Sequence, residues 1–390
     1  MPPVQPCQPR VWANPLTSQP QLLGHSGIKG KARFRRSLLI GTLSLVSWLG
    51  FTAAASAQLA RLHSISGSQV QLKRSGWTNF RRALPGTALY GDDRLRVRPG
   101  TVVVLVCPDR RVTDNVPAGD SSVSRACPDT PRRVRPTFGV SETWSAGDAA
   151  LPYVISPWSG QVLTPKPLLR WNAVAGAQLY TVTLKKRDGE DWAEVWTIQS
   201  SQTTLCYPAS QPALELGDEY VLQVVAENAA EASDDGEPVE IFSLISRDER
   251  ADAEAAIAAV NAMDASQELK TLILVDEVYP SYKLFAQGIN DLLALVESGT
   301  ETTQIYRLLG DYFIRSGLEL PTEQSYLKAI ELAATGENLE EQVRAQWGLG
   351  TLYNRVDRPE EAKVLLRQAQ QGAMALGDAK LLASIEAELP

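Results

Sequence analysis

The C-terminal part of the sequence repeats itself, and this feature constrains the fold more than any other. When residues 305–330 are aligned with residues 345–370, at an offset of 40, the Leu-Gly pairs that end at Gly310 and Gly350 coincide, and an aromatic residue follows each glycine by three positions. Such a repeat indicates stacked helical hairpins, because a single hairpin cannot bury its apolar face alone. We expect the two glycines to let neighbouring helices approach and the aromatic rings to fill the space between them.

The region that contains the repeat, residues 247–390, differs in composition from what precedes it. Proline is sparse, alanine and leucine dominate, and apolar residues recur at helical spacing. The string from Asp264 to Gly299 predicts an earlier, degenerate hairpin, and the string from Lys380 to Leu389 predicts a capping helix. The segment "WGLGTLYNRVDRPEEAKVLLRQA" resembles the tetratricopeptide repeat. The offset of 40 exceeds that family's period of about 34 residues, and Thr322 stands where the second helix of the first copy should carry a small residue.

The resemblance implies a short superhelix whose first helices line a concave face that binds a peptide or another protein. Arginine and tryptophan are favoured at binding surfaces, so this face suits an extended peptide that carries carboxylates. The alternative for each position is a solvated helix face with intrahelical ion pairs. The implied groove residues are Arg307, Asp311, Ile314, Arg315, Arg344, Trp347, Thr351, Asn354 and Arg355.

Residues 58–137 predict a small β domain. The string "SQVQLKR" alternates between polar and apolar residues, and "TVVVLV" is a β-branched run between turn signals. The string "LPGTALYGDDRLRVRPGTVVVLVCPD" resembles the FecR-like ligand-sensing sheet domains of exported bacterial proteins. Cys107 and Cys127 are each followed by Pro-Asp and flank a polar loop, so we expect a disulfide between them. Cys206 is then left as a buried free thiol.

Residues 138–150 show no period and predict a linker, and residues 151–246 predict a β-sandwich with short alternating strands. The strings "PLLRW", "GAQLYTV" and "LELGDEY" resemble fibronectin type III-like domains. That resemblance implies a buried Trp171 and a tyrosine corner at Tyr220. Trp192 and Trp196 either fill the core of the sandwich or stack on the sugar rings of a glycan.

Residues 1–57 predict a disordered extension followed by a secretory signal peptide. The basic string from Arg33 to Arg36 precedes an apolar segment that ends in "ASA" at Ala57, which is typical of a cleavage site. The alternative is an uncleaved anchor, because the apolar segment approaches the roughly 20 residues that span a bilayer. We therefore expect an exported protein, periplasmic or extracellular, that contacts a membrane only if the signal stays attached.

Charge is distributed unevenly along the rest of the chain. Residues 58–140 carry 14 basic and 6 acidic side chains, residues 141–246 carry 5 and 15, and residues 247–390 carry 13 and 24. A basic segment followed by two acidic ones suggests three units. An exported protein meets little nucleic acid, so we expect the basic segment to contact anionic glycans, lipid headgroups or the protein's own acidic modules.

Known catalytic and metal-binding patterns are absent from the sequence. It contains two histidines, His25 and His63, and lacks the G-x-S-x-G, P-loop and H-E-x-x-H patterns and the paired spacings of zinc sites. We therefore predict a multidomain α+β protein that is not an enzyme and uses no cofactor or metal. The predicted role is an exported scaffold or adaptor that binds a protein or peptide of the cell envelope through its helical repeats. The alternative is a protein that binds envelope polysaccharide or peptidoglycan through its β domains.

Overall fold

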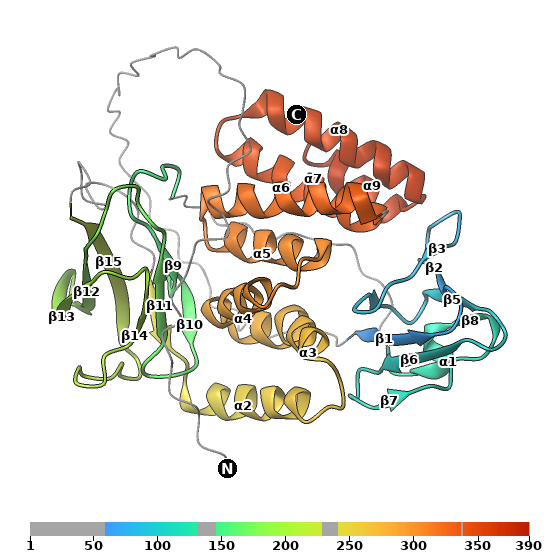
Figure 1. Ribbon diagram of the computed structural model, residues 1–390, viewed down its shortest axis with the longest axis horizontal. Helices are drawn as coiled ribbons and strands as arrows, with labels where there is room; N and C mark the ends of the chain where they lie inside the picture. The colour runs from blue at the N-terminus through green and yellow to red at the C-terminus, as the bar shows by residue number, and fades with distance from the viewer. Residues whose placement is uncertain (1–58, 131–145, 228–240, 337, 390) are drawn as a thin grey trace, which may run out of the picture.

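The computed structural model describes residues 59–130, 146–227, 241–336 and 338–389. Along the chain, β structure comes first and helical structure follows, so the expected α+β class is confirmed at this level (Figure 1). Figure 1 also shows that the helical region stands between two β units. The predicted signal peptide and most of the predicted linker lie outside the described residues.

The N-terminal β unit consists of two four-stranded sheets around a small apolar core. Its elements are β1 (Ala60–Ser66), β2 (Gln71–Lys73), β3 (Arg81–Arg82), β4 (Ala88–Leu89), β5 (Arg94–Val97), β6 (Val102–Val106), β7 (Val112–Thr113), β8 (Gly119–Ser122) and the short helix α1 (Val123–Ala126). The sheets have the orders β4-β1-β6-β7 and β3-β2-β5-β8. In β5, Leu95 and Val97 are buried and the two arginines are exposed, because successive side chains of a strand point to opposite faces.

One of the two expectations about cysteine is confirmed and the other is wrong. Cys107 and Cys127 form the expected disulfide, with their Cα atoms 5.3 Å apart. A bridge that closes a loop of this size stabilises a fold by about 3 kcal/mol. Cys206 is half-buried and disulfide-bonded, so it is not a buried free thiol. The strand-like surroundings of Cys206 say nothing about a partner, because pairing depends on the three-dimensional approach of two thiols.

The second β unit, called the sandwich here, places two sheets face to face. Its strands are β9 (Val154–Ser156), β10 (Gly160–Val162), β11 (Leu168–Trp171), β12 (Tyr180–Asp188), β13 (Asp191–Ser200), β14 (Thr204–Cys206), β15 (Glu219–Ala226) and β16 (Phe242–Leu244). The sheet orders are β10-β16-β15-β12-β13 and β14-β11-β9. Trp171 is buried between them, as expected. The Tyr220 hydroxyl accepts a hydrogen bond from the backbone N–H of Glu215 at 2.8 Å and so fixes the turn before β15.

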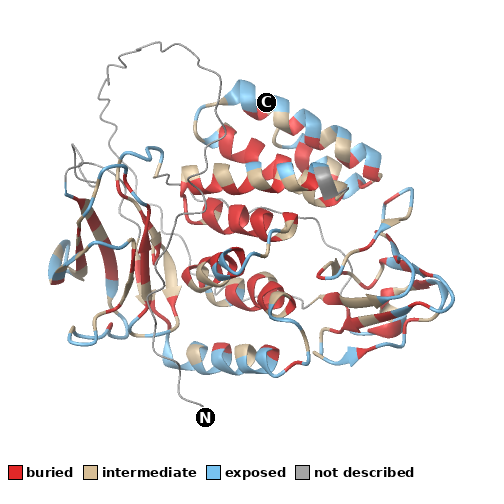
Figure 2. Cartoon of the chain, in the orientation of Figure 1, coloured by how far each residue is buried: buried red, intermediate tan, exposed pale blue. Residues whose placement is uncertain are grey.

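The helical region begins directly after β16. Its elements are α2 (Arg247–Asn261), α3 (Gln267–Ile273), the π-helical turn η1 (Leu274–Val278), the 3₁₀ turn η2 (Tyr279–Tyr282), α4 (Phe285–Glu297), α5 (Thr303–Arg315), α6 (Glu319–Gly336), α7 (Leu339–Arg355), α8 (Pro359–Leu376) and α9 (Ala379–Glu386). Helices α5 and α6 pack as one hairpin, α7 and α8 as a second, and α6 packs on α7. Buried residues are concentrated on α5 and α7, whereas α2 and the outer face of α8 are largely exposed (Figure 2).

Close packing between these hairpins depends on glycine, as the repeat predicts. A Cβ atom at Gly310 would lie 2.5 Å from the ring of Tyr326, and one at Gly350 would lie 2.8 Å from Leu366. The ring of Tyr326 is fully buried and also contacts Gly348 of α7, so it fills the space between the two hairpins. The aromatic side chains three positions after the repeat glycines, those of Phe313 and Tyr353, are buried. The expected role of the glycines is thereby confirmed.

The N-terminal β unit packs on the end of the helical region through the loop between β2 and β3. Trp77, in that loop, is only 5% exposed and lies among apolar residues of α7, α8 and α9. Its indole Nε1 donates a hydrogen bond to Asp378 at 3.3 Å, and Arg81 donates one to the carbonyl of Ala375 at 2.6 Å. The loop therefore joins the start of the described chain to its last helix.

The sandwich contacts the helical region at α4. Gly160 approaches the backbone so closely that a Cβ atom there would lie 2.5 Å from the carbonyl oxygen of Lys283. Asn290 donates a hydrogen bond to the Ser156 hydroxyl at 3.1 Å. The contact fixes the sandwich at a different part of the helical region from the N-terminal β unit.

Candidate functional site

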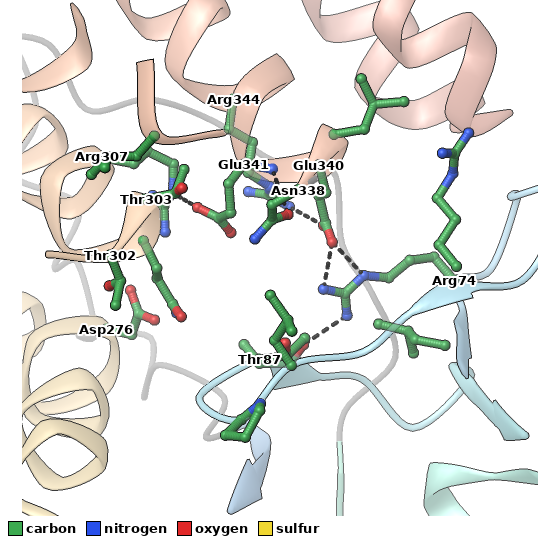
Figure 3. Close-up of a pocket in the computed structure, with 18 of the residues that line it drawn as sticks. Arg74, Thr87, Asp276, Thr302, Thr303, Arg307, Asn338, Glu340, Glu341 and Arg344 are labelled. Carbon is green, nitrogen blue, oxygen red and sulfur yellow. Dashed lines mark hydrogen bonds and ion pairs between the residues drawn. The ribbon is translucent and has the colours of Figure 1, made fainter. Parts of the chain in front are cut away.

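A cavity of about 630 Å³ lies between the N-terminal β unit and the helical region, and we call it the interdomain cleft (Figure 3). The β unit contributes the segment around β2, β3 and β4, and the helical region contributes η1 and the beginnings of α5 and α7. Basic and acidic residues are equally numerous on its wall. The charged wall residues are Arg74, Arg81, Arg82, Glu268, Asp276, Glu301, Arg307, Asp311, Arg315, Glu340, Glu341 and Arg344.

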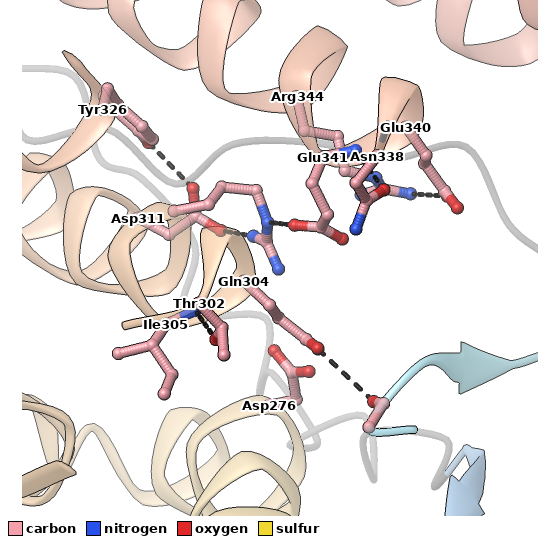
Figure 4. A network of polar contacts seen from close by, with 12 residues as sticks. Asp276, Thr302, Gln304, Ile305, Asp311, Tyr326, Asn338, Glu340, Glu341 and Arg344 are labelled. Atoms are coloured by element: carbon pink, nitrogen blue, oxygen red, sulfur yellow. Dashed lines mark hydrogen bonds and ion pairs between the residues drawn. The ribbon is translucent and has the colours of Figure 1, made fainter. Parts of the chain in front are cut away.

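Arg307 of α5 is held on the cleft wall by two carboxylates. Its Nε donates to Glu341 of α7 and its Nη1 to Asp311 one helical turn later, and Asp311 also accepts a hydrogen bond from the Tyr326 hydroxyl at 2.8 Å (Figure 4). Burial lowers the pKa of Arg307, but Glu341 and Asp311 outweigh burial and raise the pKa above its ordinary value. The guanidinium therefore stays charged. Because it has five N–H donors, it also retains donors for an acceptor bound in the cleft.

Arg74 of the N-terminal β unit closes the opposite wall of the cleft. It is 5% exposed, and its Nε and Nη2 donate to Glu340 of α7 at 3.1 and 2.8 Å (Figure 3). Its Nη1 donates to Asp93 at 2.6 Å. Burial lowers the pKa of Arg74, but Glu340 and Asp93 outweigh burial and raise it. Glu340 also accepts a hydrogen bond from Arg344 at 3.3 Å, so one carboxylate joins an arginine of each unit.

Two helices begin at the cleft. The hydroxyl of Thr302 accepts a hydrogen bond from the Ile305 N–H at 3.4 Å at the start of α5. The side chain of Asn338 accepts one from the Glu341 N–H at 3.3 Å at the start of α7. Thr302 and Asn338 both line the cleft. Because the N-terminus of a helix carries a partial positive charge, both helices favour a negatively charged group in this space.

A further ion pair lies next to the cleft, between β1 and η1. Arg61 is fully buried, donates a hydrogen bond to Asp276, and lies 3.5 Å from Glu277. Burial raises the pKa of Glu277 to about 7, against the opposing effect of Arg61. Burial lowers the pKa of Arg61, but Asp276 and Glu277 outweigh it and raise the pKa, so the guanidinium stays charged. The contact between the basic β unit and the acidic helices therefore contains a carboxyl group that titrates near neutral pH.

The predicted groove residues divide into two groups. Those that line the cleft are Arg307, Asp311, Arg315, Arg344 and Trp347.

The remaining predicted groove residues are not on the cleft wall. Ile314 and Thr351 are fully buried inside the helical region, so they lie behind the wall. Asn354 donates a hydrogen bond to the carbonyl of Glu388 at 2.9 Å, and Arg355 is exposed at the far end of α7.

The tryptophans considered for glycan stacking have different environments. Trp196 is 3% exposed, donates a hydrogen bond to the Tyr207 hydroxyl at 2.9 Å and packs edge-on against that ring. It fills the sandwich core, so its assignment as a glycan-stacking residue is wrong. Trp192 is half-buried at the β12–β13 hairpin, with the Arg187 guanidinium 4.4 Å from its ring centroid. The two environments differ because the β12–β13 pair contains a register shift. Trp196 lies on one side of the shift and points into the core, and Trp192 lies on the other side.

No family model and no curated protein matches the sequence. Among the residues that the structure describes, no three His, Cys, Asp or Glu side chains gather as potential metal ligands. No helix within the same ranges combines the length and apolar character needed to cross a membrane.

The sequence did not predict which residues of the N-terminal β unit line the cleft. Arg74 and Trp77 on the cleft wall, and Arg61 beside the cleft, resemble ordinary surface or turn residues in the sequence, because the neighbouring residues do not show what a side chain contacts after folding. The signal that pointed to them was the charge distribution along the chain. A basic N-terminal segment and an acidic C-terminal region made the protein's own acidic modules one of three expected partners, and Arg61 and Arg74 form ion pairs with them.

Proposed function

We propose that the protein is an exported, non-enzymatic adaptor that binds a short extended peptide segment with carboxylate side chains in the interdomain cleft. The observation that carries the proposal is that Arg307 and Arg344 line the cleft together with the edge of Trp347, a side chain that is 4% exposed and packs mainly on Trp77 and helices α7–α9. Arginine and tryptophan are the residue types that dominate binding energy at interfaces. A volume of about 630 Å³ falls within the range of roughly 300–1,000 Å³ of ligand pockets, so the cleft holds a segment of a partner, not a whole domain.

The charges of the cleft favour a peptide over an uncharged ligand. Arg307 and Arg344 are positioned by carboxylates before any ligand arrives, so little side-chain entropy is lost when they bind an acceptor. The starts of α5 and α7 add partial positive charge. Apolar wall residues, among them Leu84 and Pro85, accept the apolar parts of a peptide.

The proposal includes the architecture implied by the sequence resemblances. The offset of 40 and the contacts of Gly310 and Gly350 support tetratricopeptide-like hairpins in α5–α8. The strand order of the sandwich and the hydrogen bond of Tyr220 support a fibronectin type III-like unit. The signal-like N-terminal pattern and the disulfide support export to the periplasm or the cell exterior. The N-terminal β unit is the proposed FecR-like domain.

The test measures binding of defined peptides to the full chain. An array of short peptides with different numbers of Glu and Asp, each paired with its Gln and Asn counterpart, identifies the sequences that bind. Fluorescence anisotropy then compares wild type with Arg344→Gln and Arg315→Gln, whose side chains are partly exposed on the wall. Losing one charge-assisted hydrogen bond costs about 1.5–3 kcal/mol, so we expect the Kd to rise about 10-fold to 100-fold.

The matched control is Arg367→Gln on the exposed face of α8, which removes the same charge away from the cleft. We expect its Kd to stay within about 2-fold of wild type, because a distant exposed charge is screened by salt. The proposal fails if no carboxylate-bearing peptide binds better than its amide counterpart. It also fails if Arg367→Gln weakens binding as much as the cleft variants.

A further inference from the structure

The outer face of the sheet β3-β2-β5-β8 is a second charged surface, and we call it the basic sheet face. Gln71 is paired with Arg82 on one side and Arg96 on the other, and Lys73 is paired with Arg94. Paired residues point to the same side of a sheet, and neighbouring strands lie about 4.8 Å apart. The alternate residues, including Leu95, point into the core. The cations therefore form a flat array on the solvent side.

The cations of this face are largely unneutralised. Arg94 and Arg96 are 54% and 50% exposed, and within the described ranges their ion pairs go to a single carboxylate, that of Asp120. By contrast, Arg61 and Arg74 of the same unit are buried against acidic side chains of the helical region. The strands β5 and β8 lie on the side of the N-terminal β unit that faces away from the helices (Figure 1). The protein's own acidic helices therefore do not cover this face.

The composition of the face limits the kind of partner. Among the described residues, Phe80 is half-buried with the Arg96 guanidinium 3.7 Å from its ring centroid, so the cation covers this aromatic ring. The large apolar side chains exposed in the described residues lie elsewhere: Val102, Val112, Leu216, Leu327, Val364 and Met374. Insertion into a bilayer and stacking on nucleobases both require exposed apolar or aromatic groups. A polymer that offers only carboxylates needs no more than guanidinium donors on a flat surface.

We infer that the basic sheet face, through Lys73, Arg94 and Arg96, binds an acidic polysaccharide whose sugar units carry carboxylates. These three side chains do not line the interdomain cleft, although Arg82 at the edge of the same sheet does, and the partner differs in class from the proposed peptide. Since the whole chain carries a net charge of −7, attraction of a polyanion has to come from this local array. Binding there would hold the protein at a glycan layer while the cleft remains open to a peptide.

Affinity electrophoresis of the full chain through gels that contain polygalacturonate, with neutral dextran gels as the reference, tests the inference. We expect retention by polygalacturonate alone, and a loss of affinity of about 10-fold to 30-fold in Arg94→Gln/Arg96→Gln, because each cation near an anionic surface contributes about 5-fold. The matched control, Arg367→Gln/Lys380→Gln, removes the same charge from exposed helix positions and should change affinity by less than about 2-fold.

The variant Asp120→Asn distinguishes a loss of binding residues from misfolding. It should increase retention by about 2-fold or more, and a folding defect cannot increase retention. The cleft variant Arg344→Gln should leave retention unchanged, which separates this inference from the proposed function. The inference is overturned by any one of three results: no retention of wild type at low salt, an equal loss in the matched control, or tighter binding to single-stranded DNA or phosphatidylserine vesicles than to polygalacturonate.

Discussion

Replacing Trp77 with alanine should detach the β2–β3 loop from the helices while leaving both units folded. A tryptophan side chain buries about 150–250 Å², which at about 25 cal/mol per Å² corresponds to roughly 4–6 kcal/mol. The lost hydrogen bond to Asp378 adds about 1 kcal/mol. The displaced loop recovers part of this burial, so we expect a net loss of about 3–5 kcal/mol, the range measured for Trp→Ala in cores. The ratio of docked to undocked molecules should then fall more than about 100-fold.

Hydrogen exchange measures this loss directly. In Trp77→Ala, backbone amides of α9 and of residues 74–90 should exchange much faster, whereas strands β12 and β15 of the sandwich should be unaffected, because they do not contact the loop. Trp192→Ala is the matched control, since that ring is half-buried at a hairpin tip and should cost about 1 kcal/mol or less. Unchanged exchange in α9, together with a free energy of unfolding within about 1 kcal/mol of wild type, would refute the reasoning.

Two further predictions concern the buried carboxyl and the repeat glycine. Burial raises the folded-state pKa of Glu277 to about 7 from an ordinary value of 4.5. The fold therefore favours the protonated side chain, and this stabilising contribution is fully present below about pH 4.5 and is lost as the pH rises through about 7. Glu277→Gln should therefore match wild type near pH 4 and be more stable by about 3 kcal/mol near pH 8 in urea unfolding, and an equal difference at both pH values would contradict this. Gly310→Ala places a Cβ atom 2.5 Å from the Tyr326 ring, and the strain should exceed the gain in helix propensity of about 1 kcal/mol. We expect a lower urea midpoint, and a stabilised variant would show that the ring can move aside.

Features that depend on local periodicity could be predicted from the sequence. The coincidence of Gly310 with Gly350 located the hairpin contacts, because close helix packing requires a residue without a side chain at the crossing point. The buried Trp171 was instead implied by the resemblance of the string "PLLRW" to fibronectin type III-like domains. The disulfide between Cys107 and Cys127 followed from two similar local contexts that flank a short loop.

Features that depend on how separate units pack against one another could not be predicted from local sequence patterns. The strand position of Trp196 is compatible with either face until the register is known, and the alternation of its own strand is broken by a bulge. The groove positions of the tetratricopeptide family map onto Ile314 and Thr351, but neighbouring residues bury both side chains. A helical period predicts which residues share a face, and it does not predict which element covers that face. For the cleft, that element is the N-terminal β unit.

The contact between Trp77 and Asp378 joins residues 301 positions apart, and this separation has a consequence for biosynthesis. The N-terminal β unit leaves the ribosome first, when the surface that receives its tryptophan does not yet exist. It can fold around its own core, but Trp77 stays exposed to solvent until the last helix has been made. Docking of the N-terminal β unit on the last helices is thus a late step. We expect this docking to be slower than the folding of the β unit or of the helices, because it joins residues far apart in the sequence.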